Sequence, residues 1–263
     1  MNRGRSKSSV SIAGVLAIAF LCLVYFTVRR GILYNLTVRR APTSKMNAVA
    51  YGLSPTRVGS KSGYRDGAGG MVVNPQFDDA KDFSEGLAAV MVGNRRTGKW
   101  GYIDMTGNLV VSLRFERALS FSEGLAAVAD GDKWGYIDKT GKFVINPQFG
   151  YAHSFSDGLA AVWVADSATG KWDYTDKTGK LAIKPQFDDA WGFSEGLAAV
   201  KVGGLWTGKW GFIDKTGRLV INPQYLYGTS FSKGLAAVEV NRDGIPSHGY
   251  IDKTGKFVWE STE

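Results

Sequence analysis

The carboxylates are the side chains in this sequence whose type and spacing best suit catalysis. Five aspartates each start an Asp-x-Thr-Gly group, at Asp104, Asp138, Asp176, Asp214 and Asp252. Paired carboxylates serve as acid and as base or nucleophile in glycoside hydrolysis, so a carboxylate-dependent hydrolase of envelope carbohydrate is one reading. A turn position repeated five times explains the pattern more simply than five active sites. We therefore expect the protein not to be an enzyme.

Other catalytic groups are scarce. The chain of 263 residues has two histidines, His153 and His248, and one cysteine, Cys22, which lies in an apolar run. No serine elbow, phosphate-binding loop or metal-spaced set of His and Cys is present. The sequence thus predicts no catalytic residue, no metal site and no cofactor.

The aspartates belong to a longer repeat that must position them. The phenylalanine that opens each Phe-Ser-acid-Gly-Leu-Ala-Ala-Val segment recurs in steps of 38, 34, 38 and 38 residues, at Phe83, Phe121, Phe155, Phe193 and Phe231. Such a period is typical of solenoids, propellers and arrays. Residues 63–259 are expected to form one repeat domain, with a degenerate first copy and about five copies of 34–38 residues.

Each copy is expected to be a three-stranded β-meander. In the copy at 121–149, residues 125–128, 133–138 and 142–145 have the composition of strands, and Asp138-Lys139-Thr140-Gly141 has that of a tight turn. The Asn146-Pro147-Gln148-Phe149 segment is expected to turn the chain out, followed by an irregular stretch. Both faces of such a sheet are apolar, so neighbouring copies must cover them.

We expect an all-β, solenoid-like, open twisted stack of these meanders. A closed five-bladed propeller is the alternative, because propeller blades have a similar length. In either arrangement the recurring tryptophans are expected in the structural core, namely Trp100, Trp134, Trp172 and Trp210.

Two linked motifs, FSEGLAAV at 121–128 and KWGYIDKTGKFVINPQF at 133–149, resemble those of the WG (KWG) repeat family of bacterial proteins, and the resemblance covers about residues 63–259. The resemblance implies β-rich copies, often behind an export signal or membrane anchor, and loosely a binding or scaffolding role. It transfers no catalytic residue. Asp173 departs from the pattern where Gly is usual, and His248 departs where Trp is usual.

The N-terminal part has a different character. Residues 10–28 are an uncharged, mostly apolar run long enough for a transmembrane helix, and Thr27-Val28-Arg29-Arg30 is unsuited to signal cleavage. We therefore expect a basic tail at 1–9, an uncleaved single-pass anchor at 10–28, and a basic juxtamembrane segment and flexible linker at 29–62.

Charge location argues against nucleic acid as a partner. Eight of the 32 basic residues lie within residues 1–45, where no acid occurs, leaving 24 to match the 24 acids beyond. The repeat domain is therefore neutral and lacks the basic surface that nucleic-acid binding requires. Basic residues flank the apolar run on both sides, so charge barely decides orientation. We expect the repeats outside the cytoplasm, in the periplasm or extracellular space.

Binding residues are expected where the copies differ. The loop between the first two strands varies in length, and its tips carry Arg95, Arg96, Asp166 and Trp206. Length variation on one face often marks the binding side of a solenoid, although solvated loops without a role are the alternative.

Two further positions vary in residue type and yield candidate exposed aromatics, Trp163 and Trp191. These rings suit stacking on a glycan or anchoring a protein, and packing beneath a neighbouring loop is the alternative. The sequence thus favours a membrane-anchored, non-catalytic module that binds a protein or a cell-envelope polysaccharide. A purely structural spacer or accessory subunit remains a further alternative, and the oligomeric state is left open.

Overall fold

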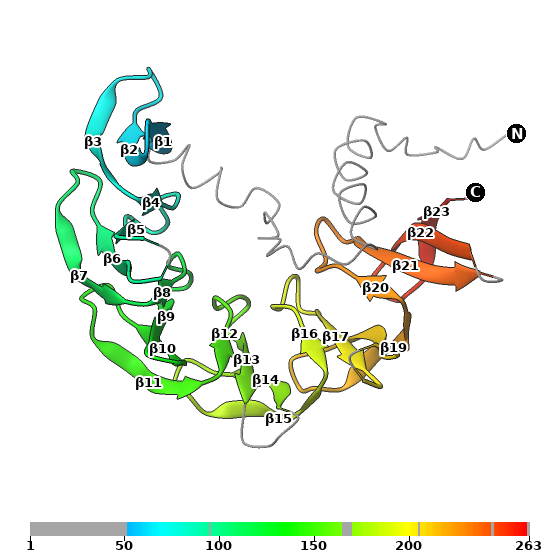
Figure 1. Cartoon of the computed structure of the whole chain (residues 1–263). Helices are drawn as coiled ribbons and strands as arrows, with labels where there is room; N and C mark the ends of the chain where they lie inside the picture. Colours follow the sequence, from blue (N-terminus) through cyan, green and yellow to red (C-terminus); the bar gives the residue numbers. More distant parts are fainter. Residues whose placement is uncertain (1–51, 95, 165–169, 205, 243–244, 262–263) are drawn as a thin grey trace, which may run out of the picture. The chain divides into compact units, whose positions relative to one another are not determined.

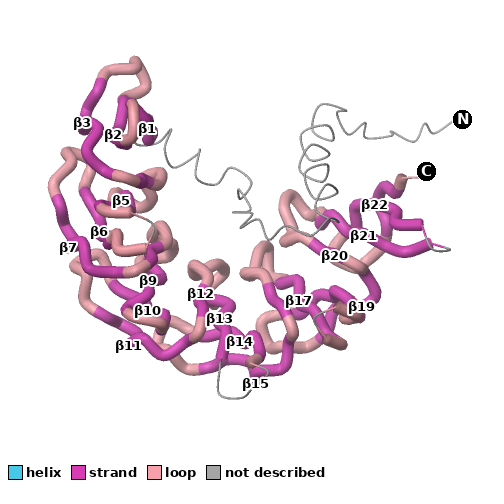
Figure 2. Tube along the Cα trace, in the orientation of Figure 1, coloured by secondary structure: helices cyan, strands magenta, loops and turns pink. Residues whose placement is uncertain are grey.

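The computed structural model describes residues 52–94, 96–164, 170–204, 206–242 and 245–261. All regular structure in this part is β-strand, joined by turns and loops (Figure 2). Among the described residues no helix is long and apolar enough to cross a membrane. The expected anchor at 10–28 and most of the expected linker lie outside the described residues.

The strands form six antiparallel sheets that follow one another in chain order (Figure 1). Sheet I has three strands, β1 (Ser54–Val58), β2 (Lys61–Arg65) and β3 (Met71–Phe77). Sheets II to VI have four strands each, in the orders β4–β7, β8–β11, β12–β15, β16–β19 and β20–β23. Strand β1 belongs to sheet I and lies within the segment expected to be a linker.

The four strands of sheets II to VI correspond from copy to copy. The first strands are β4 (Asp79–Ala80), β8 (Arg117–Ala118), β12 (Tyr151–Ala152), β16 (Asp189–Ala190) and β20 (Tyr227–Gly228). The second strands are β5 (Ala88–Val92), β9 (Ala126–Asp130), β13 (Ala160–Val164), β17 (Ala198–Val202) and β21 (Ala236–Arg242). The third strands are β6 (Lys99–Ile103), β10 (Lys133–Ile137), β14 (Lys171–Thr175), β18 (Lys209–Ile213) and β22 (Ile245–Ile251). The fourth strands are β7 (Leu109–Phe115), β11 (Phe143–Phe149), β15 (Leu181–Phe187), β19 (Leu219–Tyr225) and β23 (Phe257–Glu260).

The prediction of three strands in each copy is therefore wrong, because sheets II to VI each have a fourth strand. The stretch before each Phe-Ser, expected to be irregular, supplies a two-residue strand that pairs with the Leu-Ala-Ala-Val strand, as Asp79 pairs with Met91. Its sequence alternates around a small residue, which is Ala or Gly in every copy: Ala80, Ala118, Ala152, Ala190 and Gly228. A strand this short is easily missed because it lacks a run of β-branched residues.

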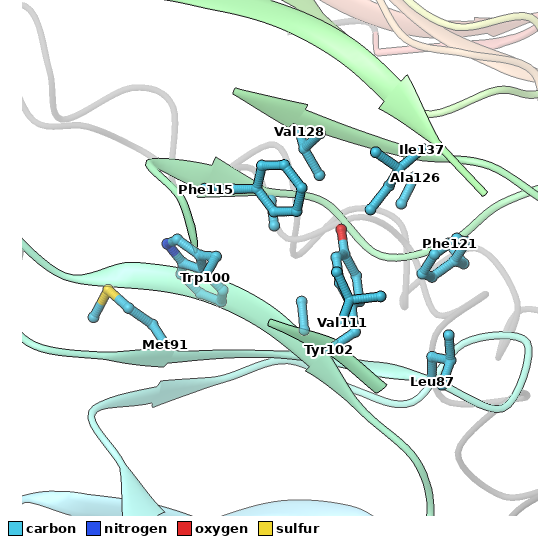
Figure 3. Close-up of a cluster of buried hydrophobic side chains, with 12 residues drawn as sticks. Leu87, Met91, Trp100, Tyr102, Val111, Phe115, Phe121, Ala126, Val128 and Ile137 are labelled. Carbon is cyan, nitrogen blue, oxygen red and sulfur yellow. The ribbon is translucent and has the colours of Figure 1, made fainter. Parts of the chain in front are cut away.

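The two faces of each sheet pack against different neighbours, as expected from their apolar alternation. Ile137, Ala126 and Val128 of sheet III share a core with Trp100 and Tyr102 of sheet II. Figure 3 shows these side chains converging from the two sheets. On its other face, sheet III packs its own tryptophan and tyrosine against sheet IV. Hydrophobic burial is thus shared between copies, which couples the stability of each sheet to its neighbours.

The Asn-Pro-Gln segment is a bulge inside the fourth strand, so the expected turn is wrong. In sheet III, Trp134 pairs with Phe149 and Tyr136 with Ile145, which leaves Gly135 opposite three residues. A Cβ on Gly135 would lie 2.6 Å from the Ile145 carbonyl oxygen. Because two backbone segments meet there, a side chain is disfavoured, which explains why glycine follows the tryptophan in three of the four copies that have one.

Asp173 occupies this glycine position in sheet IV. Its side chain is excluded from solvent, and the Tyr174 backbone N–H donates to its Oδ1. Its Oδ2 has no hydrogen-bond partner among the described residues. Burial raises the pKa of the Asp173 carboxyl to about 6, as expected for an acid removed from water.

The recurring Asp-x-Thr-Gly aspartates are turn residues, as predicted. Asp138 Oδ1 accepts hydrogen bonds from the Thr140 hydroxyl at 2.6 Å and from the Thr140 and Lys142 backbone N–H groups at 2.9 and 3.1 Å. The Thr140 hydroxyl is the main cause that lowers the pKa of Asp138. These carboxylates are therefore occupied by local backbone groups, as in Asx turns.

Candidate functional site

The most variable side chains of the copies lie in one row across each sheet. In sheet II, Asp79 pairs with Met91 and Met91 with Trp100 across three neighbouring strands. The same pairing repeats as Arg117, Ala129, Trp134; Tyr151, Trp163, Trp172; Asp189, Lys201, Trp210; and Tyr227, Glu239, His248. We call each of these sets a cross-strand row.

In four of the five rows a tryptophan is paired with two variable positions, and in the fifth His248 takes the place of the tryptophan. A third variable position, two residues after the row's first member, lies close to the same tryptophan. Lys81 places its Nζ 5.3 Å from the ring centre of Trp100. Trp191 stacks on Trp210 with centroids 6.2 Å apart and planes 17° from parallel. The tryptophans thus contact side chains whose type changes from copy to copy.

The repeat tryptophans are largely in the core, as expected, with one exception. Trp100, Trp134 and Trp210 are buried, whereas Trp172 is half-buried. Tyr151 of sheet IV lies against Trp134, with ring centroids 4.9 Å apart. The position that corresponds to Tyr151 in the next sheet is occupied by Asp189, which has no aromatic ring.

The candidate aromatics Trp163 and Trp191 are half-buried and belong to this surface. Trp163 meets Trp172 edge to face at 5.8 Å. The Trp191 Nε1–H is buried and has no acceptor among the described residues. Both rings therefore contact a neighbouring aromatic and still present part of their surface.

The variable loops begin one residue beyond the row, at the same end of the sheets. Trp206 stands on the β17–β18 loop and is 91% exposed. The base of that loop is held by Asp188, whose Oδ2 accepts from the Gly204 N–H at 2.8 Å and whose Oδ1 accepts from Lys171 at 2.5 Å. Arg96 is exposed on the β5–β6 loop. Arg95 and Asp166 lie outside the described residues.

A hollow of about 190 Å³ opens beside these rows, mainly between sheets II and III, and reaches Tyr151 of sheet IV. Its walls are Lys81, Trp100, Arg117, Ala118, Leu119, Trp134 and Tyr151. The sequence analysis did not identify Arg117 and Tyr151 as candidate site residues. In each of these segments a small residue, Ala118 or Ala152, lies between two positions that vary from copy to copy. This pattern was the signal that could have identified Arg117 and Tyr151.

The array matches a known family and known folds. The model for the "WG containing repeat" matches residues 63–95, 100–134, 134–162, 174–206 and 210–242. The chain belongs to the WG repeat family. No curated protein is significantly similar to this WG repeat protein.

Similar solved structures share the fold at low sequence identity. A eukaryotic initiation factor has a TM-score of 0.56 and 12% identity, with 80% of this chain and 62% of that chain covered. A prolyl endopeptidase has a TM-score of 0.51 and 12% identity, covering 84% and 45%. Hsv2 of Kluyveromyces lactis has a TM-score of 0.50 and 10% identity, covering 77% and 71%. The WG repeat chain thus spans less than two thirds of the first two structures.

No group of three or more His, Cys, Asp or Glu side chains that could hold a metal occurs in the described part of the chain. The site consists of the tryptophan rings of the cross-strand rows and of the variable side chains beside them, which are charged, aromatic or aliphatic in different copies. Such a surface suits recognition, because aromatic anchors supply contact area and the variable groups supply selectivity.

Proposed function

We propose that this WG repeat protein is a non-catalytic binding module whose cross-strand rows contact a protein or a cell-envelope glycan. The observation that carries the proposal is that variable residues lie beside the recurring tryptophans of the cross-strand rows. Residues that serve only packing are expected to vary within one chemical class. The middle row position instead takes Met91, Ala129, Trp163, Lys201 and Glu239.

Alanine substitution at Trp163 tests this role against plain packing. Pull-down of envelope material by the purified repeat domain is compared with thermal unfolding of the same variant. Reduced capture at nearly unchanged stability supports the proposal. Unchanged capture with a large loss of stability would contradict it. Arg96→Ala, on an exposed loop of the same surface, shows whether the variable loops share in capture.

The non-catalytic part of the proposal is supported by the turn role of the repeated aspartates. Each carboxylate accepts hydrogen bonds within its own turn, as Asp214 does from the Thr216 hydroxyl at 2.5 Å. Incubation with envelope polysaccharide should release no shorter products. Product release that disappears in a single Asp→Asn variant would overturn this part.

The proposal includes a membrane anchor at residues 10–28, with the repeats outside the cytoplasm. Its support is the uncharged apolar run. Protease added to intact cells should digest the repeats of the full chain, and removal of residues 1–45 should release them from the membrane fraction. Full protection in intact cells that ends on lysis would place the repeats inside the cytoplasm.

We also propose an open stack of sheets in place of a closed ring. Among the described residues, no sheet combines strands from both ends of the array: β1–β3 and β20–β23 form separate sheets. Small-angle scattering should give a radius of gyration larger than that of a compact ring with the same number of residues.

A further inference from the structure

The hollow between sheets II and III gathers two cations against apolar walls. Lys81 and Arg117 line it together with Trp100, Leu119, Trp134 and Tyr151. Neither cation forms an ion pair with another described residue. The ion pair between neighbouring sheets lies at other positions: Lys61 pairs with Asp78 and Lys171 with Asp188, and at this junction Lys99 pairs with Glu116.

This combination is special to one junction. Three corresponding positions surround each of the four junctions between the four-stranded sheets II to VI. They are Lys81, Arg117 and Leu119 at the first; Leu119, Tyr151 and His153 at the second; His153, Asp189 and Trp191 at the third; and Trp191, Tyr227 and Thr229 at the fourth. Only the junction of sheets II and III places both a lysine and an arginine there.

The ammonium of Lys81 is largely removed from water, and this burial lowers its pKa. Asp79 acts in the opposite direction through its charge, but its own Oδ1 accepts from the Ala80 N–H at 2.9 Å. A carboxylate between Lys81 and Arg117 would compensate both cations where water is partly excluded. Arg117 is exposed, so the site is accessible from solvent.

The size and surroundings of the hollow indicate the group that carries the carboxylate. A space of about 190 Å³ is smaller than the roughly 300–1,000 Å³ of pockets for whole drug-sized ligands. It therefore fits one ring-sized unit of a longer ligand. From Tyr151, half-buried aromatic side chains continue over sheets IV and V, at Trp163, Trp172 and Trp191. Such rings offer contact to further units of a saccharide chain.

We propose that this hollow is a subsite for an acidic sugar residue, with its carboxylate held between Lys81 and Arg117 and its ring against the apolar walls. The proposal rests on the binding role proposed above and specifies its ligand class. A peptide carboxylate would meet the same cations, and it serves as the competing outcome of the test.

Calorimetric titration of the WG repeat domain with a trimer of glucuronic acid, and with a trimer of glucose, tests the subsite. The acidic trimer should bind at least tenfold more tightly. Arg117→Met should weaken its binding about tenfold or more without changing binding of the neutral trimer. Lys142→Met, which removes an exposed charge in the β10–β11 turn, is the matched control and should change affinity by less than twofold.

Equal binding of both trimers, no binding of either, or an unchanged affinity in Arg117→Met would overturn the subsite. Tighter binding of a glutamate-rich peptide than of the acidic trimer would overturn the ligand class. Arg117 is exposed, so this variant is expected to fold, and circular dichroism checks it. If capture of envelope material depends on Trp163 but the acidic and neutral trimers bind equally, the proposed binding role is supported and this inference is wrong.

Discussion

The Ser122 hydroxyl donates a hydrogen bond to the carbonyl oxygen of Phe155 in the next copy, at 2.7 Å. The same bond joins Ser84 to Phe121, Ser156 to Phe193 and Ser194 to Phe231. Beside it, the acidic residue after the serine accepts from the glycine N–H of the next turn, as Glu123 does from Gly158 at 3.1 Å. The constant Phe-Ser-acid-Gly sequence is thus a connector between sheets.

Ser122→Ala should destabilise the array because it leaves the Phe155 carbonyl without its partner. We expect a loss of about 1–3 kcal/mol in the free energy of unfolding, measured by urea denaturation. Ser232→Ala is the matched control, because Ser232 forms no such bond among the described residues and is exposed. Its effect should stay within about 0.5 kcal/mol. Equal losses in both variants would show that the hydroxyl acts within its own turn.

Gly135→Ala tests the close approach of the bulge. The added Cβ would lie 2.6 Å from the Ile145 carbonyl oxygen and 2.8 Å from the Pro147 nitrogen. Since both are backbone atoms, we expect a loss of about 1–3 kcal/mol or more, seen as a lowered denaturation midpoint. Gly192→Ala is the control, because its Cβ would meet no atom closer than 3.9 Å. A neutral Gly135→Ala would show that the bulge is adaptable.

Asp173 should make the array less stable as pH rises. The pKa of the Asp173 carboxyl is about 6 when folded, against its ordinary value of 3.8. Between these values the unfolded chain loses a proton that the folded chain keeps, so stability falls through this range and levels off above about pH 6. The loss is at most about 3 kcal/mol, at 1.36 kcal/mol per unit of pKa shift.

Urea denaturation at pH 4.0 and pH 8.0 measures this effect as the difference between wild type and Asp173→Asn. The wild type should lose more stability than the variant on going to pH 8.0. Asp138→Asn tests the opposite dependence on pH: the pKa of Asp138 is lowered when folded, so its stabilisation is present above its ordinary pKa of 3.8 and is lost only below it, which requires a further measurement below pH 4.0. A wild-type profile identical to that of Asp173→Asn would place Asp173 in contact with water.

Trp191 and Trp206 should differ in their contributions to stability. Trp191 is half-buried and stacked on Trp210, so Trp191→Ala should cost about 1–3 kcal/mol, less than the roughly 3–5 kcal/mol of a fully buried ring. Trp206 is 91% exposed, and Trp206→Ala should change stability by no more than about 0.5 kcal/mol. Thermal unfolding of the two variants compares them. A large loss at Trp206 would mean that its indole packs in solution.

The sequence was informative where physical constraints are local. The alternation of Trp134 and Ile137 between faces and the Asp138 turn each depend on neighbours within a few residues, and the repeat period can be read directly from the spacing of the motifs. The bulge was missed because Pro147 suggests the end of a strand, and its accommodation depends on Gly135 in the adjacent strand. The acid after Ser122 was not identified as a connector, since its partner lies in another copy.

The candidate site depended on register, which the pattern alone could not provide. The sequence identified Trp163 and Trp191 as variable but treated Trp172 as separate scaffold. Pairing across β12, β13 and β14 places the constant and variable residues side by side. The hollow was beyond prediction for the same reason, because it joins Lys81 and Arg117 from different sheets.

The connectors also give the array a direction. Each of the first four turns offers a carboxylate to the turn that follows, whereas the fifth has Lys233 in that place, with the same backbone conformation at φ 54°. An ammonium group donates hydrogen bonds and cannot accept one. A designed sixth copy joined after this turn would therefore meet a donor facing a donor. Lengthening the array by protein engineering would first require Lys233→Glu.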